Sequence, residues 1–500
     1  MPESTFTVYY TSDIHGCFSS KNGQPGLSGC LGAMGTEPDA LLLDGGDVLQ
    51  GSPFTYCLNA TGAGVGEAVA GLMGLAGYRF ITLGNHDFSF GKAETERYIA
   101  AFPGTCLCAN IEGLRGVKEY ALFTLPNGIR VGITGVITPA VPRLERAENI
   151  AGLRFTDPVA AAKAALDRMR AQGAAITVCL CHMGLENDPV TGAPVLDADE
   201  HRACALAASL DFTLVLAGHS HFPYAGGYMG KTFIAAPPDK GAAFLRVRMD
   251  ENGVSDAALV PAGAPDARTE AYLMPYEKAC NAYLDAPLAR LTAPIPAAPF
   301  LTAALRGSAL ANLINAVQLA ATGADVSCAS LPNTPVGLET TVTARAVTEA
   351  YPFPNTLRVL RVDRAILVRA LERTAAFLCL DANGTPGIAP EALLPAPQFY
   401  NFDHFSGITA GIDLARPAGS RVVSVLYGGR ELPPDKKLNL CVNDYRASGA
   451  GGYGFYRDSE TVLTGTDGMQ ELLLEYFRAH PVLTPDTARH ITFYNGKEEL

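Results

Sequence analysis

Apolar residues along the first half of the chain fall into short β-branched runs separated by longer Ala- and Gly-rich runs. Short apolar runs that end at Gly or Asp predict buried strands, and longer runs predict helices. Asp157 precedes one Ala-rich run and predicts its N-cap. Strands that alternate with helices indicate an α/β layered architecture. The predicted strands are residues 5–12, 40–43, 80–83, 176–181 and 213–217, and the predicted helices are 63–77 and 158–171.

The pattern changes after residue 252, where Pro-, Gly- and Ala-rich stretches flank a mostly helical connector at 267–291. Such breaks indicate a linker between domains. Beyond it, helical patterns at 301–321 and 363–379 precede short strands separated by Gly and Pro. We therefore predict a first domain over residues 1–255, a linker with a connector helix over 256–298, and a second, α+β domain over 299–500.

The composition is typical of a folded protein, because 48% of the 500 residues are hydrophobic and 18% are charged. Acidic residues outnumber Lys and Arg by 50 to 38, which gives a formal net charge of −12. This charge disfavours binding to polymeric nucleic acid, whereas a metal or a helix N-terminus can still hold a small anion. No apolar run is long enough and free enough of Pro and polar residues to predict a membrane span.

The N-terminal residues enter a strand pattern by Thr5 without a basic start or an apolar segment, so the printed sequence shows no signal peptide. The twelve cysteines form no CxxC motif, and Cys106, Cys108, Cys179 and Cys181 lie in apolar, strand-like runs. We expect buried thiols in a reducing compartment, and a cytoplasmic location unless a leader has been removed from this chain.

Five short polar motifs each follow a predicted strand, and together they hold five of the nine histidines. Strand ends are where α/β proteins build their sites. Asp13 and His15 are two residues apart, as are His219 and His221, so each pair points to one side of an extended segment and can chelate one ion. The motifs are Asp13-Ile14-His15-Gly16, Gly46-Asp47-Val48-Leu49-Gln50-Gly51, Gly84-Asn85-His86-Asp87, Cys181-His182-Met183-Gly184 and Gly218-His219-Ser220-His221.

Imidazole, carboxylate and amide donors from several strand ends are the ligands that a two-metal hydrolytic site needs, since a carboxylate can bridge two divalent ions. Each motif alone has a plainer explanation. DxH can be a turn with a hydrogen-bonded histidine, GD a strand-to-loop junction, and His182 a structural residue. Clustered polar side chains beside glycines, as in GNHD and GHSH, serve packing poorly. The five motifs together favour a metal site.

The ordered series DxHG, GDxxxG, GNHD, H and GHxH resembles the calcineurin-like metallophosphoesterases. The resemblance implies a four-layer α-β-β-α sandwich that holds two divalent metal ions, chosen among Mn, Zn, Co and Fe. It implies catalytic roles for Asn85, as a ligand, and for His86, which would face the phosphoryl group and stabilise its charge or protonate the leaving oxygen. The implied ligands are Asp13, His15, Asp47 and His221 for one metal, and the bridging Asp47 with Asn85, His182 and His219 for the other.

The chain departs from this family at Ser89, where many members have an Asp or Asn that orients the catalytic histidine. A serine can hydrogen-bond there but carries no charge. Three other polar residues near the motifs receive plainer interpretations. We expect Asp44 to cap a turn or support a ligand from behind, Asp87 to be a loop carboxylate, and His201 to lie on a helix surface.

The second half carries three aromatic or Gly-rich patches, at 351–357, 399–403 and 443–452. Core packing is the expected role of Phe353 and Phe399. Tyr445 instead lies among polar neighbours before Gly449, Gly451 and Gly452, which either let backbone approach a ligand or form a turn. Two aromatic faces can sandwich a nucleobase.

YPxPNTL, YNFDxxxGI and NxYRAxGxGG resemble the C-terminal domain of bacterial 5′-nucleotidases, and more closely the branch that hydrolyses 2′,3′-cyclic nucleotides and 3′-nucleotides. The resemblance implies that Tyr445 and one of Tyr400 or Phe402 clamp the base. Residues 327–333 lack the arginine of the 5′-nucleotidase branch, and the last Gly-rich loop lacks an Asp common there. Both absences weaken the interpretation as a plain 5′-nucleotidase. The family is mostly exported.

The leading hypothesis is a dimetal 2′,3′-cyclic-nucleotide 2′-phosphodiesterase/3′-nucleotidase that acts as a monomer or weak homo-oligomer on small nucleotides. The alternative enzyme is a 5′-nucleotidase or a nucleotide-sugar diphosphatase with the same metals. A catalytically silent nucleotide- or metal-binding protein would bind without turnover. A protein phosphatase would share the first domain's motifs but would have no use for a base clamp.

Overall fold

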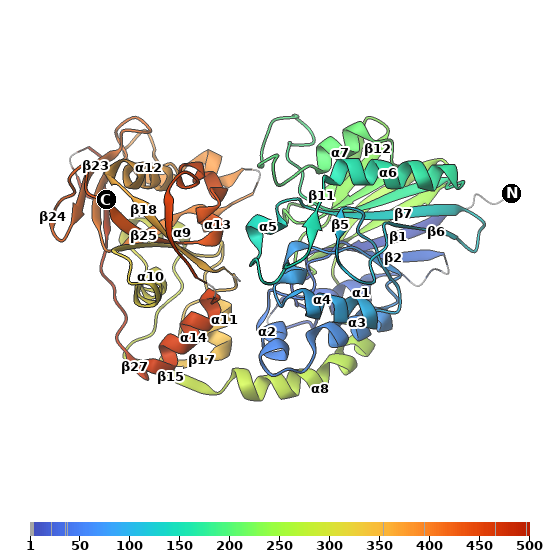
Figure 1. Cartoon of the computed structure of the whole chain (residues 1–500), viewed down its shortest axis with the longest axis horizontal. Coiled ribbons are helices and arrows are strands. Elements are labelled where there is room, and N and C mark those ends of the chain that lie inside the picture. The colour runs from blue at the N-terminus through green and yellow to red at the C-terminus, as the bar shows by residue number, and fades with distance from the viewer. Residues whose placement is uncertain are drawn as a thin grey trace. The chain divides into compact units, whose positions relative to one another are not determined.

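The computed structural model describes residues 5–21, 23–35, 37, 39–353, 355–394, 396–465, 467–496 and 498–500. The chain forms two compact units, Met1–Ala282 and Tyr283–Leu500 (Figure 1). Pro354, in the aromatic patch at 351–357, lies outside the described residues.

Two six-stranded sheets make the centre of the first unit. The first has the order β14 (Gly253–Pro261), β13 (Ala243–Asp250), β1 (Phe6–Thr11), β2 (Ala40–Asp44), β3 (Phe80–Ile81) and β4 (Thr105–Cys106). The second has the order β11 (Tyr224–Met229), β12 (Thr232–Ala236), β10 (Leu214–Ala217), β9 (Ile176–His182), β7 (Arg130–Ile137) and β6 (Tyr120–Thr124). A two-stranded pair, β5 (Ile111–Glu112) with β8 (Arg154–Phe155), lies apart from them.

Helices cover the outer faces of both sheets, which gives the predicted four-layer sandwich (Figure 1). On the side of the first sheet lie α1 (Gly26–Ala33), α2 (Pro53–Ala60), α3 (Val65–Ala76) and α4 (Lys92–Ala101). On the side of the second lie α6 (Pro158–Ala171) and α7 (Ala203–Ser209), and the short α5 (Val141–Leu144) follows β7.

The core between the sheets follows from the alternation of side chains along a strand. In β1, Val8 and Tyr10 belong to the buried cluster that also contains Leu180 and Leu216 of the other sheet. Tyr9, between them, packs on the opposite face with Cys30 of α1. The predicted strands and helices of this half are therefore confirmed, and the Asp157 cap is present because its Oδ1 accepts from Ala160 N at 2.8 Å.

Strands β1 to β4 pair in parallel, and so do β7, β9, β10 and β12. Parallel strands bring their carboxyl ends to one edge of a sheet. The segments that follow β1, β2 and β3, and those that follow β9 and β10, carry the five polar motifs. The topology thus gathers motifs that are up to about two hundred residues apart in sequence.

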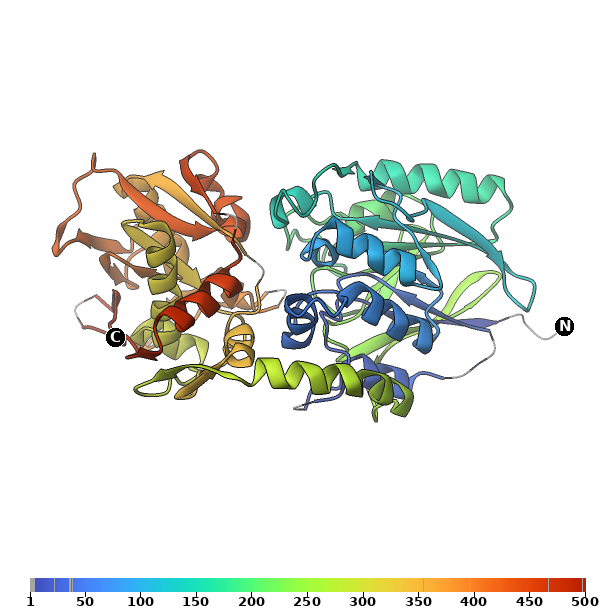
Figure 2. The same ribbon diagram turned by 60° about the horizontal axis from the view of Figure 1, so that its bottom comes forward.

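Helix α8 (Ala267–Leu284) begins where the connector helix was expected and packs along the first unit (Figure 2). Glu277 accepts from Ser19 Oγ at 2.6 Å and pairs with Lys21 Nζ at 2.5 Å. The connector predicted at 267–291 is thus mostly helical, and its last residues are extended. Pro287 disfavours helical backbone just before it, and strand β15 (Pro287–Leu291) follows instead.

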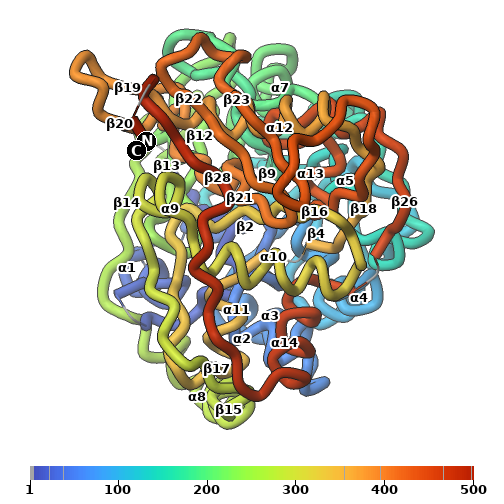
Figure 3. Tube along the Cα trace, turned by 90° about the vertical axis from the view of Figure 1, so that its left-hand side faces the viewer, coloured from blue at the N-terminus to red at the C-terminus, as the bar shows by residue number. Residues whose placement is uncertain are grey.

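The second unit is an α+β domain with three main sheets (Figure 3). A five-stranded sheet has the order β21 (Asp403–Ser406), β16 (Val326–Ser330), β25 (Leu438–Asn443), β18 (Leu357–Val362) and β26 (Glu460–Thr464). A four-stranded sheet has the order β24 (Arg430–Glu431), β23 (Val422–Tyr427), β22 (Thr409–Asp413) and β28 (Ile491–Tyr494). A smaller sheet joins β17 (Thr341–Thr343), β15 and β27 (Val482–Leu483), and β19 (Leu378–Leu380) pairs with β20 (Pro386–Ile388).

Its helices are α9 (Phe300–Arg306), α10 (Ala309–Thr322), α11 (Ala344–Ala350), α12 (Arg364–Ala375), α13 (Asp444–Ala447) and α14 (Met469–Ala479). The predicted helix at 301–321 is two helices, because Gly307 has a φ of +86° and Ser308 caps α10 by accepting from Ala311 N. Among the described residues no single helix is long and apolar enough to cross a membrane. Only α9 and α10 taken together, bent by 63°, reach that length and composition.

Candidate metal centre

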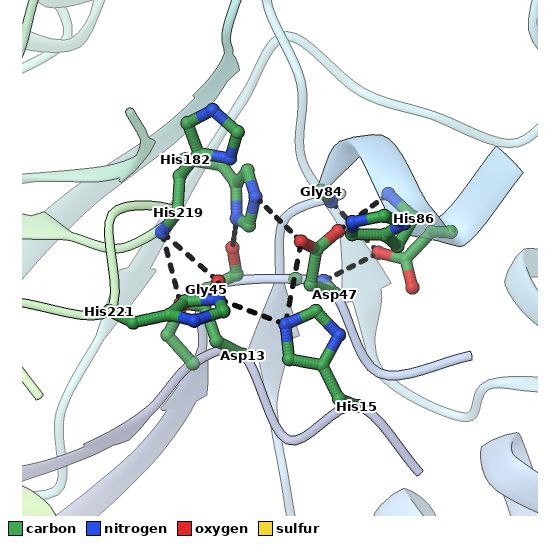
Figure 4. Close-up of polar contacts among 12 residues, drawn as sticks. Asp13, His15, Gly45, Asp47, Gly84, His86, His182, His219 and His221 are labelled. Atoms are coloured by element: carbon green, nitrogen blue, oxygen red, sulfur yellow. Dashed lines mark hydrogen bonds and ion pairs between the residues drawn. The ribbon is translucent and has the colours of Figure 1, made fainter. Parts of the chain in front are cut away.

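Eight polar side chains converge where the parallel strands of the first unit end (Figure 4). Asp13 and His15 follow β1, and Asp47 follows β2. Asn85 and His86 begin the 3-10 turn η1 (Asn85–Phe88) after β3. The remaining members, on the second sheet, are His182 as the last residue of β9 and His219 and His221 after β10.

The donor atoms form two groups, and Asp47 stands between them. Asp13, His15 and His221 make one group, Asp47, His182 and His219 make the other, and within each group the donor atoms lie within 4.8 Å of one another. Asp47 Oδ2 is 3.3 Å from His182 Nε2 and 3.9 Å from His15 Nε2. A carboxylate in this position can contact an ion in either group.

Unpaired polar atoms show that the residues fit a cation. Asn85 Oδ1 and His182 Nε2 are buried and make no hydrogen bond among the described residues, and His182 Nε2 faces Asp47 Oδ2 at 3.3 Å. Buried polar atoms normally have partners, so acceptors in this cluster that make no hydrogen bond favour a bound ion or water. Mixed oxygen and nitrogen donors suit Mn, Zn, Co or Fe.

Backbone strain is concentrated at the same residues. Among the described non-glycine residues, positive φ angles occur at six positions, and five of them belong to the cluster. The five are Asp13 (57°), His15 (52°), Asp47 (58°), His219 (69°) and His221 (57°). Such a conformation is unfavourable for a side chain with a Cβ, so the surrounding structure must hold it. The donors are therefore aimed before any ligand arrives.

The outer ring nitrogens of the histidines are held by the protein. His15 Nδ1 lies 3.0 Å from the Gln50 carbonyl, and His182 Nδ1 lies 2.7 Å from the Gly45 carbonyl. Contacts of this kind fix the tautomer and leave the other nitrogen for the metal.

Two carboxylates that the sequence did not predict complete this support. Glu200 Oε1 lies 3.0 Å from His219 Nε2, and Asp239 Oδ2 lies 3.5 Å from His221 Nδ1. Both residues come from loops with no motif, so spacing offered no signal for them. The loop that carries Glu200 also buries His201, whose Nδ1 accepts from Gly184 N at 3.2 Å. The expectation that His201 lies on a helix surface was wrong.

Asp87 was expected to be a simple loop carboxylate, but it also binds backbone N–H groups of two loops. It is buried and accepts from the backbone N–H groups of Asp47 (2.9 Å), Val48 (2.9 Å), Leu49 (3.0 Å) and Gly84 (2.8 Å). These bonds tie the loop after β2 to the loop after β3. Gly84 must be glycine here, since a Cβ would overlap Asp47 Oδ1 and His182.

Charges within the cluster keep its two carboxylates ionised. Burial raises the pKa of Asp47, but the neighbouring His182, His86 and His15 outweigh it and hold the pKa well below its ordinary value. For Asp13, burial is likewise outweighed by His221 and His182, so its pKa is also lowered. His86, whose backbone N donates to Asp47 Oδ1 at 2.7 Å, has its pKa lowered to about 4, mainly by burial.

Asp44 behaves oppositely and should make stability depend on pH. Burial raises its pKa from 3.8 to about 8, although Thr11 Oγ1 and Gly46 N donate to its oxygens at 2.6 and 2.9 Å. The folded state therefore favours the protonated form, so this stabilisation is complete below about pH 4 and is lost as the pH rises toward 8. We expect the free energy of unfolding of metal-free protein to fall with pH by up to about 1.4 kcal/mol per unit in this window.

Urea unfolding at about pH 5.5 and about pH 8 measures this, with Asp44→Asn as the matched control. An Asn stays neutral and can keep both contacts. The free energy of unfolding of Asp44→Asn, relative to that of the wild type, should therefore be higher at about pH 8 than at about pH 5.5. A difference that does not change with pH would contradict the raised pKa.

In the second unit, the patches at 399–403 and 443–452 meet around a buried arginine. The guanidinium of Arg446 pairs with Asp403 (Nη2 to Oδ1, 2.8 Å), donates to Asn401 Oδ1 at 3.1 Å and to the Tyr400 carbonyl at 3.0 Å. It lies 4.3 Å from the Tyr453 ring centroid. This network, which the sequence did not predict, fixes the position of both aromatic segments.

Phe402 is not available as a base clamp. Its side chain is 1% exposed and packs in the core of the second unit with Phe300 and Phe377. The inclusion of Phe402 among the substrate-binding residues is therefore corrected, and Tyr400 and Tyr445, both half-buried, remain. Tyr400 and Phe402 are two residues apart, but Tyr400 lies in the short 3-10 turn Phe399–Asn401 and Phe402 follows it, so the two side chains do not alternate as they would along a strand.

The glycines at 449–452 are needed by the protein's own packing. Gly451 has a φ of +69°, and a Cβ there would overlap Asn401 and crowd Arg446. Gly451 O also accepts from Arg373 Nε at 3.0 Å. The loop therefore wraps tightly over two guanidinium groups, which is a turn-like role rather than evidence of a ligand.

Known proteins resemble this chain along nearly its whole length. A family model described as calcineurin-like phosphoesterase matches residues 6–223, and one described as the 5′-nucleotidase C-terminal domain matches residues 288–457. A Haemophilus influenzae protein named 2′,3′-cyclic-nucleotide 2′-phosphodiesterase/3′-nucleotidase is 23% identical over 88% of this chain and 78% of its own. The protein of that name from Yersinia enterocolitica is 23% identical over 92% of this chain and 82% of its own.

Among solved structures, a Staphylococcus aureus protein described as a 5′-nucleotidase in complex with alpha-ketoglutarate superposes with a TM-score of 0.86. It is 26% identical and covers 98% of this chain and 100% of its own. The chain therefore belongs to the metal-dependent phosphoesterases of the nucleotidase family, with a calcineurin-like domain followed by a 5′-nucleotidase C-terminal domain. That family implies metal ions and nucleotide substrates.

Proposed function

We propose that the protein uses two divalent metal ions to hydrolyse nucleotide phosphoesters, with 2′,3′-cyclic nucleotides and 3′-nucleotides as its preferred substrates. The observation that carries the proposal is the pair of donor groups with Asp47 placed between them. The two relatives named for these activities support the choice of substrate.

The ligands follow from the two groups. Asp13, His15, Asp47 and His221 would hold one ion, and Asp47, Asn85, His182 and His219 would hold the other. When bound, the ions would polarise the phosphoryl oxygens and lower the pKa of the attacking water. Glu200 and Asp239 would keep His219 and His221 in the orientation that ligation requires.

The remaining chemistry belongs to His86 and the aromatic side chains. His86 is anchored through its backbone to Asp47 and is not needed as a ligand, so its ring is free to serve the leaving oxygen. Tyr400 and Tyr445 would bind the base by stacking. Arg446 would hold both of them in place. It donates to the Tyr400 carbonyl, and it directly follows Tyr445 in helix α13.

A substrate panel tests the proposal. We expect metal-dependent turnover of 2′,3′-cAMP and 3′-AMP, abolished by EDTA and restored by Mn²⁺. Turnover of 5′-AMP or a nucleotide sugar alone would overturn the substrate preference and assign the protein to the 5′-nucleotidase branch, which the Staphylococcus aureus structure favours. Binding without turnover of any ester would contradict the proposal that the protein is a phosphoesterase.

Within this panel, Tyr445→Ala should raise KM for nucleotides by roughly 5- to 100-fold, because a stacked base contributes about 1–3 kcal/mol. Tyr427→Ala is the matched control, because Tyr427 is a half-buried tyrosine of the same unit whose hydroxyl donates to Asp325 at 3.1 Å. An unchanged KM in Tyr445→Ala would contradict the proposal that Tyr445 stacks on the base.

A further inference from the structure

The guanidinium group of Arg373, in the last turn of α12, is held by the second unit along one edge. Its Nε donates to the Gly451 carbonyl at 3.0 Å. Its Cζ lies 4.6 Å from the ring centroid of Phe377 and 6.0 Å from that of Tyr453. Aromatic faces attract such a cation, so the rings and the carbonyl together fix the position of the group.

The two terminal nitrogens of Arg373 are left without partners. They make no hydrogen bond and no ion pair within the described parts of the chain. Asp403, a buried carboxylate of this region, is already paired with Arg446 at 2.8 Å. Burial lowers the pKa of the Arg373 guanidinium, which means that the charge is partly desolvated. A partly desolvated cation without an anion partner favours a ligand that supplies hydrogen-bond acceptors.

Arg373 also lies beside the segments that carry the proposed base clamp. Gly451, which accepts from Arg373, packs against the Arg446 guanidinium so closely that a Cβ would lie 2.5 Å from Nη1. Arg446 directly follows Tyr445 and donates to the Tyr400 carbonyl. Arg373 and the two tyrosines therefore belong to one hydrogen-bonded network, which sets their spacing before a base binds.

The shape of the free edge selects the ligand. The terminal N–H groups of a guanidinium lie side by side in one plane and match two adjacent acceptor atoms. Guanine offers such a pair at O6 and N7, whereas adenine places an amino donor beside N7. Among pyrimidines, cytosine offers O2 beside N3, whereas uracil has an N–H donor between its two carbonyl oxygens. The matching bases are therefore guanine and cytosine.

We propose that Arg373 is a specificity-determining residue that binds two adjacent acceptors of the nucleobase, so that guanine and cytosine are preferred over adenine and uracil. The inference rests on the proposed function, because it needs a base held by Tyr400 and Tyr445. It adds which bases the site prefers and which residue distinguishes them. Arg373 acts through binding, and no bond of the ester forms or breaks at it.

Turnover of four 3′-nucleotides by the Mn²⁺-loaded whole chain tests the preference. We expect kcat/KM to be ~5- to 150-fold higher for 3′-GMP than for 3′-AMP, and for 3′-CMP than for 3′-UMP, which is the discrimination that a good bidentate pair gives. Each comparison stays within purines or within pyrimidines, so the area available for stacking is the same. A preference within one pair alone would support the inference and identify the base, and equal values within both pairs would overturn it.

Two substitutions test whether Arg373 causes the preference. Arg373→Lys keeps the charge but loses the planar pair of donors, and Arg373→Met loses both. We expect each to bring the values within a pair close together, with kcat on p-nitrophenyl phosphate, which has no base, little changed. Equal losses on all four nucleotides would show that Arg373 only supports the loop at Gly451 and would overturn the inference.

Arg369→Met is the matched control for these variants. Arg369 lies one turn earlier in α12, is exposed, and has its Cζ 4.7 Å from the Phe455 ring centroid. It has the same side chain on the same helix, without a hydrogen bond to the loop that carries Gly451. The variant should keep the wild-type preference within both pairs. A preference that is lost equally in Arg369→Met would overturn the assignment to Arg373.

Binding of nucleosides separates this inference from the proposed hydrolysis. Calorimetry with the Mn²⁺-loaded whole chain measures Kd for guanosine, adenosine, cytidine and uridine, which carry no phosphate. We expect the same preference, and its loss in Arg373→Lys. If a chain that hydrolyses no nucleotide shows this preference, the proposed function fails and the inference stands. If nucleotides are hydrolysed without a preference, the function stands and the inference fails. If no nucleoside binds and no nucleotide is hydrolysed, both fail.

Discussion

Asp47→Asn should reduce kcat on every substrate by ~10³-fold or more. The substitution keeps the size of the side chain, and Oδ1 can still accept from His86 N, so the loop after β2 should keep its shape. It removes the negative charge of the carboxylate that lies between the two donor groups, 3.3 Å from His182 and 3.9 Å from His15. Several kcal/mol of transition-state stabilisation depend on metals held in register, and each 1.4 kcal/mol is about tenfold in rate.

Steady-state turnover and metal content by mass spectrometry measure this effect together. Asp256→Asn, on the exposed face of the first unit where Asp256 pairs with Arg246, is the control and should behave as wild type. Near-normal turnover by Asp47→Asn would show that the carboxylate does not bridge the ions. Lost turnover with full metal content would place its role in the reaction rather than in binding.

Arg446→Met should destabilise the second unit by about 3–5 kcal/mol. The guanidinium is 1% exposed and pairs with Asp403, which is equally buried. Removal of one partner leaves the other as an uncompensated buried charge, which is the costly way to break such a pair. Asn401 and the Tyr400 carbonyl would also lose a donor.

Hydrogen exchange of peptides from β18 and β25 in increasing urea, read in the intact chain, reports the stability of this unit. Arg364→Met is the matched control, because Arg364 forms an exposed pair with Glu431 at 2.9 Å and such pairs contribute less than about 1 kcal/mol. The double variant with Asp403→Leu should recover part of the loss, since it removes the orphaned charge as well. A loss of under about 1 kcal/mol in Arg446→Met would show that the pair does not stabilise the fold.

Much of the first unit could be predicted because its signals are local. The apolar runs of β1, β2 and β9 and the cap at Asp157 depend on neighbours within a few residues. The motif residues were found for the same reason, since each is tied to the end of a strand.

The errors concern residues whose role depends on partners distant in sequence. His201 is buried because the loop after β9 folds back over the site. Phe402 and Tyr400 are close in sequence, and only the packing of Phe300 and Phe377 decides which of them is buried. Glu200 and Asp239 support the site histidines from loops without any motif, so no spacing in the chain pointed to them.

The sequence by itself determined the class of fold, the order of the motifs and the donor types of the metal centre, because periodicity and residue chemistry are properties of short segments. The tertiary structure decided which carboxylates stand behind the histidines and which aromatic side chain faces outward. It also placed Asp47 between the two groups of donors. Those outcomes depend on distances between segments up to 206 residues apart, and only the packed sheets set such distances.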